Sequence, residues 1–263
     1  MKEFFGFGGY QRTPEGFLSW QHILFVSCFI AAMIASAIYF GHKYRGRNEK
    51  DKNKVLLWTA LILDSCEVFR VVISCIACED PWRWLYELPL FLCGIPLILI
   101  PLAALSKGRM REASLDFVFI FGILGAVLGT YGAGQNYNAY PVLSFNNLIS
   151  ALTHTMSGFA SLYIVISGMD SMKKKNIWIS FCILFAFCAM AFTANTLLDY
   201  NYMFLVRGDG TPYDIFYNLV GGNPVLYPMI VILLFILYIT AFYGVYHLIK
   251  RQLRSKAQER TEC

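Results

Sequence analysis

The chain has 263 residues, of which 57% are hydrophobic and 15% are charged, with a formal net charge of +5. Soluble domains carry roughly 25% charged residues, so this composition argues against an ordinary soluble enzyme and favours an integral membrane protein. The positive net charge alone would allow a nucleic-acid-binding protein, but the distribution of the basic residues along the chain argues against one.

The hydrophobic residues form blocks that are too long for the core of a soluble domain. Each block holds roughly 18–26 residues, enough for an α-helix to cross a hydrocarbon layer of ~30 Å. We therefore predict an all-α, polytopic membrane protein, a bundle of seven transmembrane helices that forms a single domain over residues 1–263. The predicted spans are about 19–41, 55–78, 87–106, 114–132, 145–168, 177–198 and 224–249.

Lysine and arginine alternate between the loops that join these spans. Loops 42–54, 107–113 and 169–176 and the tail after residue 249 together hold 17 of them, whereas the other loops and the N-terminal segment hold four. The positive-inside rule then places the N-terminus outside and the C-terminus in the cytoplasm. Because the basic residues flank the membrane in this alternating way, we expect no nucleic-acid partner.

The second predicted span carries charged and polar residues on one helical face, including Asp64, Glu67, Arg70 and Ser74. Charged groups inside a membrane are costly, so such residues mark a functional site by default. Glu67 and Arg70 are three residues apart and can pair on a helix. Two interpretations stay open, a buried ion pair that fixes helix packing and an Arg70 that binds a lipid phosphate or another oxyanion.

Cys93 and His154 are the most informative pair in the sequence, and each lies within its own apolar span. Both spans enter from the outside, which puts Cys93 ~9 Å and His154 ~14 Å below the outer surface. The two side chains can meet if the third and fifth spans are neighbours. Small residues next to His154, such as Ser157 and Gly158, are explained by close helix packing. A packing role for His154 and an apolar filler role for Cys93 remain alternatives.

Other potentially reactive residues carry weaker signals. Cys75 and Cys78 form a Cys-x-x-Cys at the outer end of the second span, but no second such motif supports a redox or zinc site. We predict no metal and no cofactor. His22 lies near the outer end of the first span, where it can point into the cavity or reach the membrane interface, and the interface is slightly favoured.

Five segments in a fixed order resemble the YwaF-like family of integral membrane proteins, which includes transmembrane protein 164 of animals. These segments are SWQHIL, ELPLFLC, FGILGAVLG, LTHTMSGFASLYIVI and NTLLDYNYMF. The resemblance runs from the first span to the seventh, and its most specific parts are LPLFLC at 88–93 and the string that begins at Asn195. The chain departs from the family pattern at Phe91, where the motif has a histidine, and at Leu198-Asp199-Tyr200, where Leu-Gly-Thr is usual.

Animal members of this family are viewed as lipid acyltransferases that use a cysteine and a histidine in membrane helices. The resemblance puts these two catalytic residues at Cys93 and His154. It implies phospholipid and lysophospholipid substrates, no cofactor, and a location in the membrane, which we expect to be a bacterial cell membrane. Further candidates for substrate binding or oxyanion stabilisation are Arg70, Glu67, Asn195, Asn201 and His22.

The leading hypothesis is an acyl transfer in which His154 takes the proton of Cys93 and the thiolate attacks a lipid ester. One alternative is a non-enzymatic transporter or sensor that uses a cavity with Glu67, Arg70 and His154. Inverted repeats would favour a transporter, and none is visible in the sequence. Another alternative is an acyl-lipid hydrolase, in which water accepts the acyl group. The acyl donor, the acceptor and the oligomeric state are not specified by the sequence.

Overall fold

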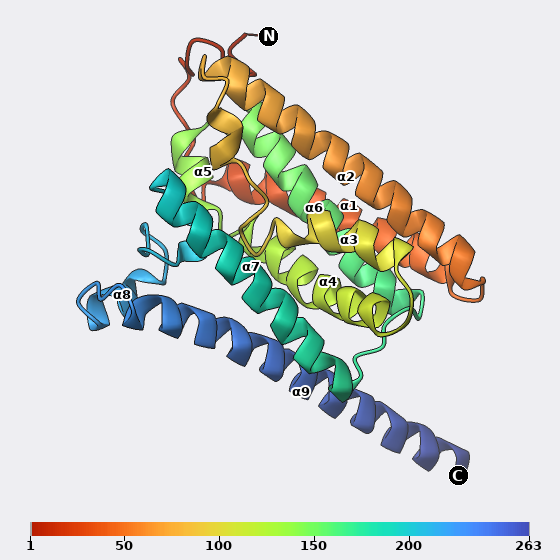
Figure 1. Cartoon of the computed structure of the whole chain (residues 1–263). Helices are drawn as coiled ribbons and strands as arrows, with labels where there is room; N and C mark the ends of the chain where they lie inside the picture. The colour runs from red at the N-terminus through yellow and green to blue at the C-terminus, as the bar shows by residue number, and fades with distance from the viewer. Residues whose placement is uncertain (1, 263) are drawn as a thin grey trace. The chain divides into compact units, whose positions relative to one another are not determined.

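A computed structural model of the protein describes the backbone of residues 2–262 and the side chains of residues 2–253 and 255. Within this described part the chain forms helices and no strand (Figure 1), which confirms the predicted all-α class. Contacts divide the chain into two compact units, Met1–Asp170 and Ser171–Cys263. The single domain inferred from the sequence stays a prediction.

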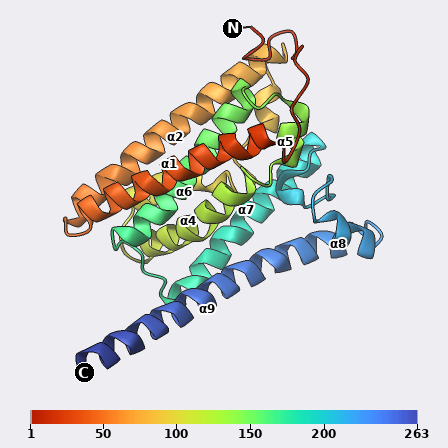
Figure 2. The same ribbon diagram turned by 180° about the vertical axis from the view of Figure 1, so that it is seen from behind.

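The first unit is organised around a central helix, α6, which packs against α1, α2 and α4. Helix α3 packs against α2 and α4, so it lies on the same side of the unit as these two helices. Figure 2 shows α1 running along α6 on the opposite side. The helices of this unit are α1 (Trp20–Tyr44), α2 (Glu49–Ala77), η1 (Arg83–Tyr86), α3 (Ile95–Leu105), α4 (Gly108–Leu128), α5 (Gly134–Ala139) and α6 (Phe145–Ile166).

Small residues allow α4 and α6 to approach each other closely. A Cβ atom at Gly122 would lie 2.6 Å from the carbonyl oxygen of Ser157, and one at Gly158 would lie 2.6 Å from Cβ of Ala126. The Ser161 hydroxyl donates a hydrogen bond of 2.6 Å to the backbone carbonyl of Phe119 on α4. Glycine and serine at helix contacts permit this close backbone approach in membrane bundles, as the sequence led us to expect for α6.

The third predicted span, 87–106, is helical only over Ile95–Leu105, and this corrects the expected position of Cys93. Pro89 removes a backbone donor and disfavours helical geometry at the residue before it. Pro96, in contrast, lies in the first turn of α3, where its missing N–H costs nothing. Cys93 therefore lies in a turn directly before α3 rather than inside a helix.

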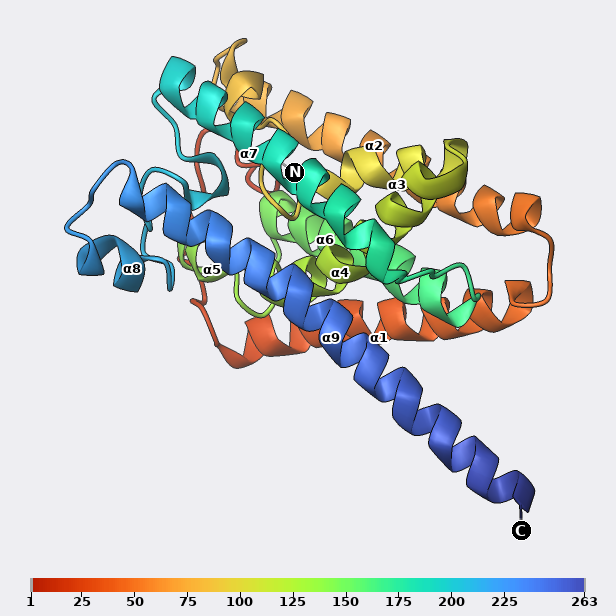
Figure 3. The ribbon, with the colours of Figure 1, turned by 60° about the horizontal axis from the view of Figure 1, so that its bottom comes forward.

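In the second unit, α7 packs against α9, and the short helix α8 also contacts α9 (Figure 3). A left-handed residue, Asp199, ends α7. The elements of this unit are η2 (Lys174–Asn176), α7 (Ile177–Leu198), η3 (Tyr202–Phe204), α8 (Asp214–Leu219) and α9 (Leu226–Glu262).

Four helical segments in the described part are long and apolar enough to cross a membrane. Helix α2 has 29 residues but carries charged side chains near its middle, and α3 has only 11 residues. The expectation of transmembrane helices is therefore supported, while the count of seven and the orientation of the termini stay predictions. The four segments are Trp20–Tyr44, Phe145–Ile166, Lys174–Leu198 and Leu226–Leu253.

Candidate functional site

Cys93 and His154 lie against the same residue of α4, Gly125. A Cβ atom built on Gly125 would lie 3.6 Å from Cβ of Cys93 and 3.8 Å from Nδ1 of His154. The sum of these two distances, 7.4 Å, is an upper limit on the separation of the two atoms. Because Sγ is one bond away from Cβ and moves with χ1, the thiol can come closer to the imidazole by rotation. The structure thus brings together two residues that are 61 positions apart in the sequence.

Two glycines of α4 make the space for the His154 ring. A Cβ atom at Gly129 would overlap three atoms of that ring, so the imidazole lies directly on the backbone of α4. Gly125 and Gly129 are four residues apart and therefore lie on one face of the helix. Sequence reasoning did not assign this role to the two glycines, although their small-x-x-x-small spacing is a signal for close approach by a neighbouring element.

The turn before α3 presents the thiol of Cys93. The side chain has no disulfide partner and is exposed, so a substrate can reach it. Gly94 is the N-cap residue of α3, which places Cys93 immediately before the start of that helix. The N-terminal end of a helix carries a partial positive charge and favours a nearby thiolate. Reactive cysteines are commonly found in such positions.

The predicted ion pair between Glu67 and Arg70 is present. Arg70 donates from Nη2 to Oε1 of Glu67 at 2.6 Å and from Nε to Oε2 of Glu67 at 3.1 Å. A second carboxylate, Glu87, accepts a bond of 2.6 Å from Nη1 of Arg70. Glu87 also accepts a bond of 3.1 Å from the hydroxyl of Ser74. Sequence reasoning missed Glu87, because its partner lies 17 residues earlier in the chain.

This charged cluster borders the site of Cys93 and His154. Glu67 and Arg70 lie within range of electrostatic interaction with both residues. The Arg70 guanidinium is shared by two carboxylates, so a lipid phosphate would have to displace one of them to bind it with the same geometry. Glu87 lies six residues before Cys93 and is therefore placed to hold the non-helical segment 87–94 against α2. Asp64 on the same face of α2 has a buried Oδ1 that lacks a hydrogen-bond partner among the described residues.

His22 is fully buried, so the slight preference for the membrane interface was wrong. The backbone N–H of Leu18 donates to Nδ1 at 3.1 Å, and Nε2 lies 3.1 Å from the carbonyl oxygen of Thr130. These contacts require the neutral tautomer with hydrogen on Nε2. The ring of Tyr137 in α5 lies 3.8 Å from the ring of His22, and burial raises the pKa of Tyr137 to about 12. These contacts give His22 a role in joining α1 to the loop after α4.

Asn195 and Asn201 lie in the second unit, where their amides bind backbone groups. Asn195 Oδ1 accepts from the N–H of Tyr202 at 2.6 Å, and its Nδ2 donates to the carbonyl oxygen of the same residue at 3.1 Å. Asn201 Nδ2 donates to the carbonyl oxygen of Arg207 at 2.7 Å and to Oδ2 of Asp209 at 2.8 Å. Both asparagines thus stabilise the loop after α7, and their assignment to substrate binding stays a prediction.

The described residues place no group of three or more histidine, cysteine, aspartate or glutamate side chains in a position to hold a metal ion. Cys75 and Cys78 both carry free thiols. The groups that the structure brings to Gly125 of α4 are the side chains of Cys93 and His154.

A family model, that of the TMEM164 family, matches residues 17–246. The chain belongs to the TMEM164 family. The matched range contains Cys93, His154 and the Arg70 cluster, and family membership together with the apolar helices supports a membrane protein. Comparison of this TMEM164-family chain with curated proteins and with solved structures gave no match.

Proposed function

We propose that this TMEM164-family chain is a membrane-embedded lipid acyltransferase that works through a thioester on Cys93, with His154 as the base. The observation that carries the proposal is the common contact of both residues with Gly125. Nucleophilic catalysis requires a thiol and a base within reach of each other, and a thiolate is the reactive form of cysteine. The exposed residue Cys93 lies before a helix N-terminus and near His154, and this arrangement supports the proposal.

In the first step, His154 accepts the proton of the Cys93 thiol. The thiolate attacks the carbonyl carbon of a phospholipid ester and forms a tetrahedral oxyanion. When this intermediate collapses, the bond between the carbonyl carbon and the glycerol oxygen breaks. The leaving oxygen takes the proton from His154, which yields a lysophospholipid and an acyl-thioester on Cys93.

In the second step, the hydroxyl of a lysophospholipid acceptor gives its proton to His154 and attacks the thioester carbon. The carbon–sulfur bond breaks, the thiolate takes back the proton, and a new phospholipid ester leaves the site. If water replaces the lysophospholipid in this step, the product is a free fatty acid and the protein is a hydrolase. Neither step requires an added oxidant, reductant or nucleotide.

The Arg70 cluster has a positioning role in this proposal. Its bonds to Glu67 and Glu87 connect α2 to the segment that carries Cys93. The assignment of Glu67 and Arg70 to substrate binding requires that a phosphate or oxyanion compete with Glu87 for the guanidinium. In the positioning role, Arg70 keeps its bonds to Glu67 and Glu87 and holds the segment that carries Cys93, so no phosphate has to compete with Glu87.

The proposal includes a topology of seven membrane spans, with the N-terminus outside and the C-terminus in the cytoplasm. The alternating distribution of lysine and arginine supports it. So do the lengths of α2 and α4, which have 29 and 21 residues. Alkaline phosphatase fused after residue 263 should be inactive and should be active when fused before residue 1. The reverse pattern would exclude this orientation.

Detection of the acyl-enzyme tests the proposed function directly. The purified protein is mixed with a phospholipid of defined acyl chains and analysed by intact-protein mass spectrometry. We expect a mass increase equal to one acyl group, which neutral hydroxylamine removes because it cleaves thioesters. The adduct should be absent from Cys93→Ala and present in Cys28→Ala, a matched control at an exposed cysteine of α1.

The lipid products of the same reaction separate the remaining alternatives. New phospholipid formed from an added lysophospholipid indicates transfer, whereas free fatty acid indicates hydrolysis. An adduct that persists in Cys93→Ala assigns the nucleophile to another residue. Wild-type protein with neither an adduct nor any lipid turnover would exclude the enzyme and favour the transporter or sensor.

Gly125→Ala should impair acylation without unfolding the protein. The added methyl group would meet Cys93 and His154 at ordinary van der Waals distances of 3.6 and 3.8 Å, so it fits but fills the space between thiol and base. Alanine is also favoured over glycine within a helix by ~1 kcal/mol. We expect an unchanged or raised melting temperature and an acylation rate at least about tenfold lower, equivalent to ~1.4 kcal/mol.

Gly244→Ala is the matched control for this variant. Gly244 lies in α9, and a Cβ atom there would meet no atom within 4 Å. This control should gain the same helix propensity and keep the wild-type acylation rate. Equal acylation rates in Gly125→Ala and wild type would contradict the proposed path of the proton between Cys93 and His154.

A further inference from the structure

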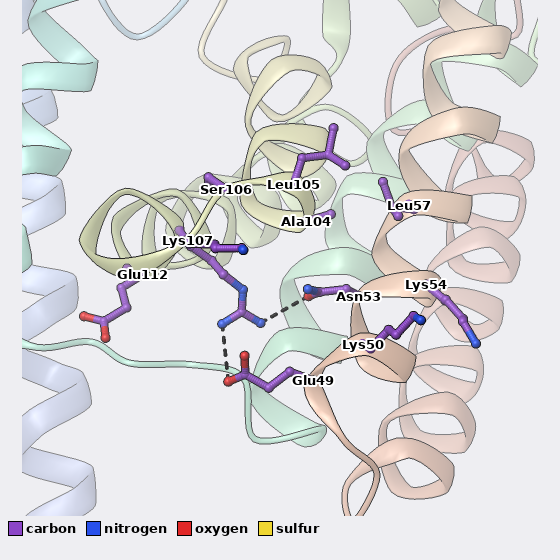
Figure 4. Close-up of a pocket in the computed structure, with 12 residues that line it drawn as sticks. Glu49, Lys50, Asn53, Lys54, Leu57, Ala104, Leu105, Ser106, Lys107 and Glu112 are labelled. Carbon is purple, nitrogen blue, oxygen red and sulfur yellow. Dashed lines mark hydrogen bonds and ion pairs between the residues drawn. The ribbon is translucent and has the colours of Figure 1, made fainter.

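A pocket with polar and charged lining residues lies at the far end of α3 from Cys93, where the first turns of α2 and α4 come together (Figure 4). Its volume is about 700 Å³. The 11 residues of α3 separate it from the turn of Cys93 by about 16 Å, at a rise of ~1.5 Å per residue. The pocket is therefore distinct from the proposed acyl-transfer site, and it uses other residues.

Basic side chains outnumber acidic ones in the lining of this pocket. Lys50 and Lys54 come from α2, and Lys107 and Arg111 come from the start of α4. The acidic residues are Glu49 and Glu112. In Figure 4 the carboxylate of Glu112 points away from α2, whereas Glu49 faces the space between the two helices. In the same view the amines of Lys50 and Lys54 extend away from α4, and Lys54 pairs with Asp51 at 3.0 Å. The charges between α2 and α4 are therefore those of Lys107, Arg111 and Glu49, which sum to a net positive charge.

Two buried polar atoms in the lining lack a hydrogen-bond partner among the described residues, Oγ of Ser106 and Nε of Arg111. The side chain of Arg111 is only 13% exposed, and it donates from Nη2 to Oδ1 of Asn53 at 3.1 Å. The ion pair of Arg111 with Glu49 is weak, because Nη1 is 3.7 Å from Oε1 of Glu49 and the Glu49 side chain is 80% exposed. Leaving buried polar groups unpaired is unfavourable, and a ligand with several acceptor oxygens would satisfy both.

The backbone adds to the positive character of the pocket. Helix α4 begins at Gly108, with no acidic residue in its first turn and no side-chain cap from the described residues. The unpaired N–H groups at the start of a helix, together with the helix dipole, favour an anion. The N-terminal end of the 21-residue helix α4 therefore favours an anion, as the unpaired donors of Ser106 and Arg111 also do.

We infer that this pocket binds a phosphate group. A phosphate has several acceptor oxygens, and arginine and helix N-termini are its usual protein partners. The phosphate can belong to a lipid headgroup or to a soluble phosphate compound. Leu57, Ala104 and Leu105 form an apolar part of the lining that suits the adjoining glycerol and acyl carbons of a lipid. The basic loops at this end are those predicted to be cytoplasmic.

Thermal melting in a phosphate-free detergent solution tests the inference with the full chain. One arm adds inorganic phosphate, with sodium chloride at the same ionic strength as the control. The other arm adds phosphatidic acid in mixed micelles, with diacylglycerol of the same chains as the control. A melting temperature raised by inorganic phosphate indicates a soluble ligand, and one raised only by phosphatidic acid indicates a lipid headgroup. No rise in either arm overturns the inference.

Two variants assign any binding to this pocket. Ser106→Ala removes an unpartnered hydroxyl, and Lys107→Gln removes an exposed charge, so neither breaks a contact described for the free protein. We expect each to weaken phosphate binding at least about threefold and the double variant about tenfold. Arg45→Gln, at an exposed arginine beyond α1, is the matched control and should bind as wild type does.

Acyl-enzyme formation on Cys93 is the independent readout for these variants. It should persist in Ser106→Ala, because Ser106 lies at the other end of α3. Phosphate binding that is equal in the wild type, Ser106→Ala and Lys107→Gln would overturn the inference. If the wild type binds phosphate but forms no acyl-enzyme, the proposed function is contradicted and the inference about this pocket is not.

Discussion

Replacing Cys93 or His154 by alanine should abolish acyl transfer while the protein remains folded in the membrane. Cys93→Ala removes the only atom that can form the thioester in the proposed mechanism. His154→Ala removes the base, and general acid–base catalysis contributes typically 10²–10⁴-fold to a rate. Both residues lie against Gly125, so each loss acts on the same step. The measurement is the rate at which a labelled acyl chain moves from phospholipid to lysophospholipid.

Conservative and distant variants separate a catalytic effect from a folding defect. His154→Gln has a side chain of similar size without the base and should be as inactive as His154→Ala. Cys28→Ala and His42→Ala change exposed residues of α1 and should keep the wild-type rate. Full lipid turnover in both Cys93→Ala and His154→Ala, measured on folded protein, would exclude the acyl-enzyme mechanism.

Arg70→Ala should lower the free energy of unfolding by ~3–5 kcal/mol, the typical cost when one partner of a buried ion pair is removed. The variant removes the guanidinium that binds both Glu67 and Glu87 at 2.6 Å, and of the described ionic contacts of these carboxylates only the weaker one of Arg83 with Glu87 at 3.4 Å remains. The side chains of Arg70, Glu67 and Glu87 are 14–25% exposed, so water reduces the loss toward the lower end of this range. Thermal unfolding in detergent measures the effect.

Arg83→Ala is the matched control for this loss. Arg83 is 40% exposed and contacts Glu87 at 3.4 Å, so its removal should cost less than ~1 kcal/mol. A variant with apolar side chains of similar volume at all three positions, Glu67, Arg70 and Glu87, should recover much of the stability. Wild-type melting of Arg70→Ala would contradict a stabilising role for this partly buried ion pair.

The acyl-transfer rate of the triple apolar variant distinguishes the two roles considered for Arg70. If the ion pair only positions the segment that carries Cys93, the stable triple variant should lose part of kcat and keep its KM for phospholipid. If Arg70 binds the lipid phosphate, KM should rise in every variant that lacks the arginine. A higher KM for phospholipid in the single variant Glu87→Gln would also indicate that Glu87 and the lipid phosphate do not compete for Arg70.

Some features of this protein follow from the sequence by itself, because they depend on local composition. Apolar blocks of membrane-spanning length predict helices wherever they occur, since backbone groups in hydrocarbon must be satisfied within the helix. The pairing of Glu67 with Arg70 was also predictable, because a separation of three residues on a helix determines their contact. The family was identifiable from ordered motifs such as LPLFLC and NTLLDYNYMF.

Other features were decided only by the tertiary structure, because they depend on contacts between distant segments. No sequence spacing relates Cys93 and His154 to Gly125, or Arg70 to Glu87 across the turn after α2. His22 shows the same limit, since an apparent interface residue is buried by Thr130 and Tyr137. The sequence by itself determined most of the helices and the chemical groups that they carry, but not the turn before α3 that holds Cys93. Packing decided which of these groups meet, because close approach depends on small residues such as Gly125 and Gly129 on a neighbouring helix.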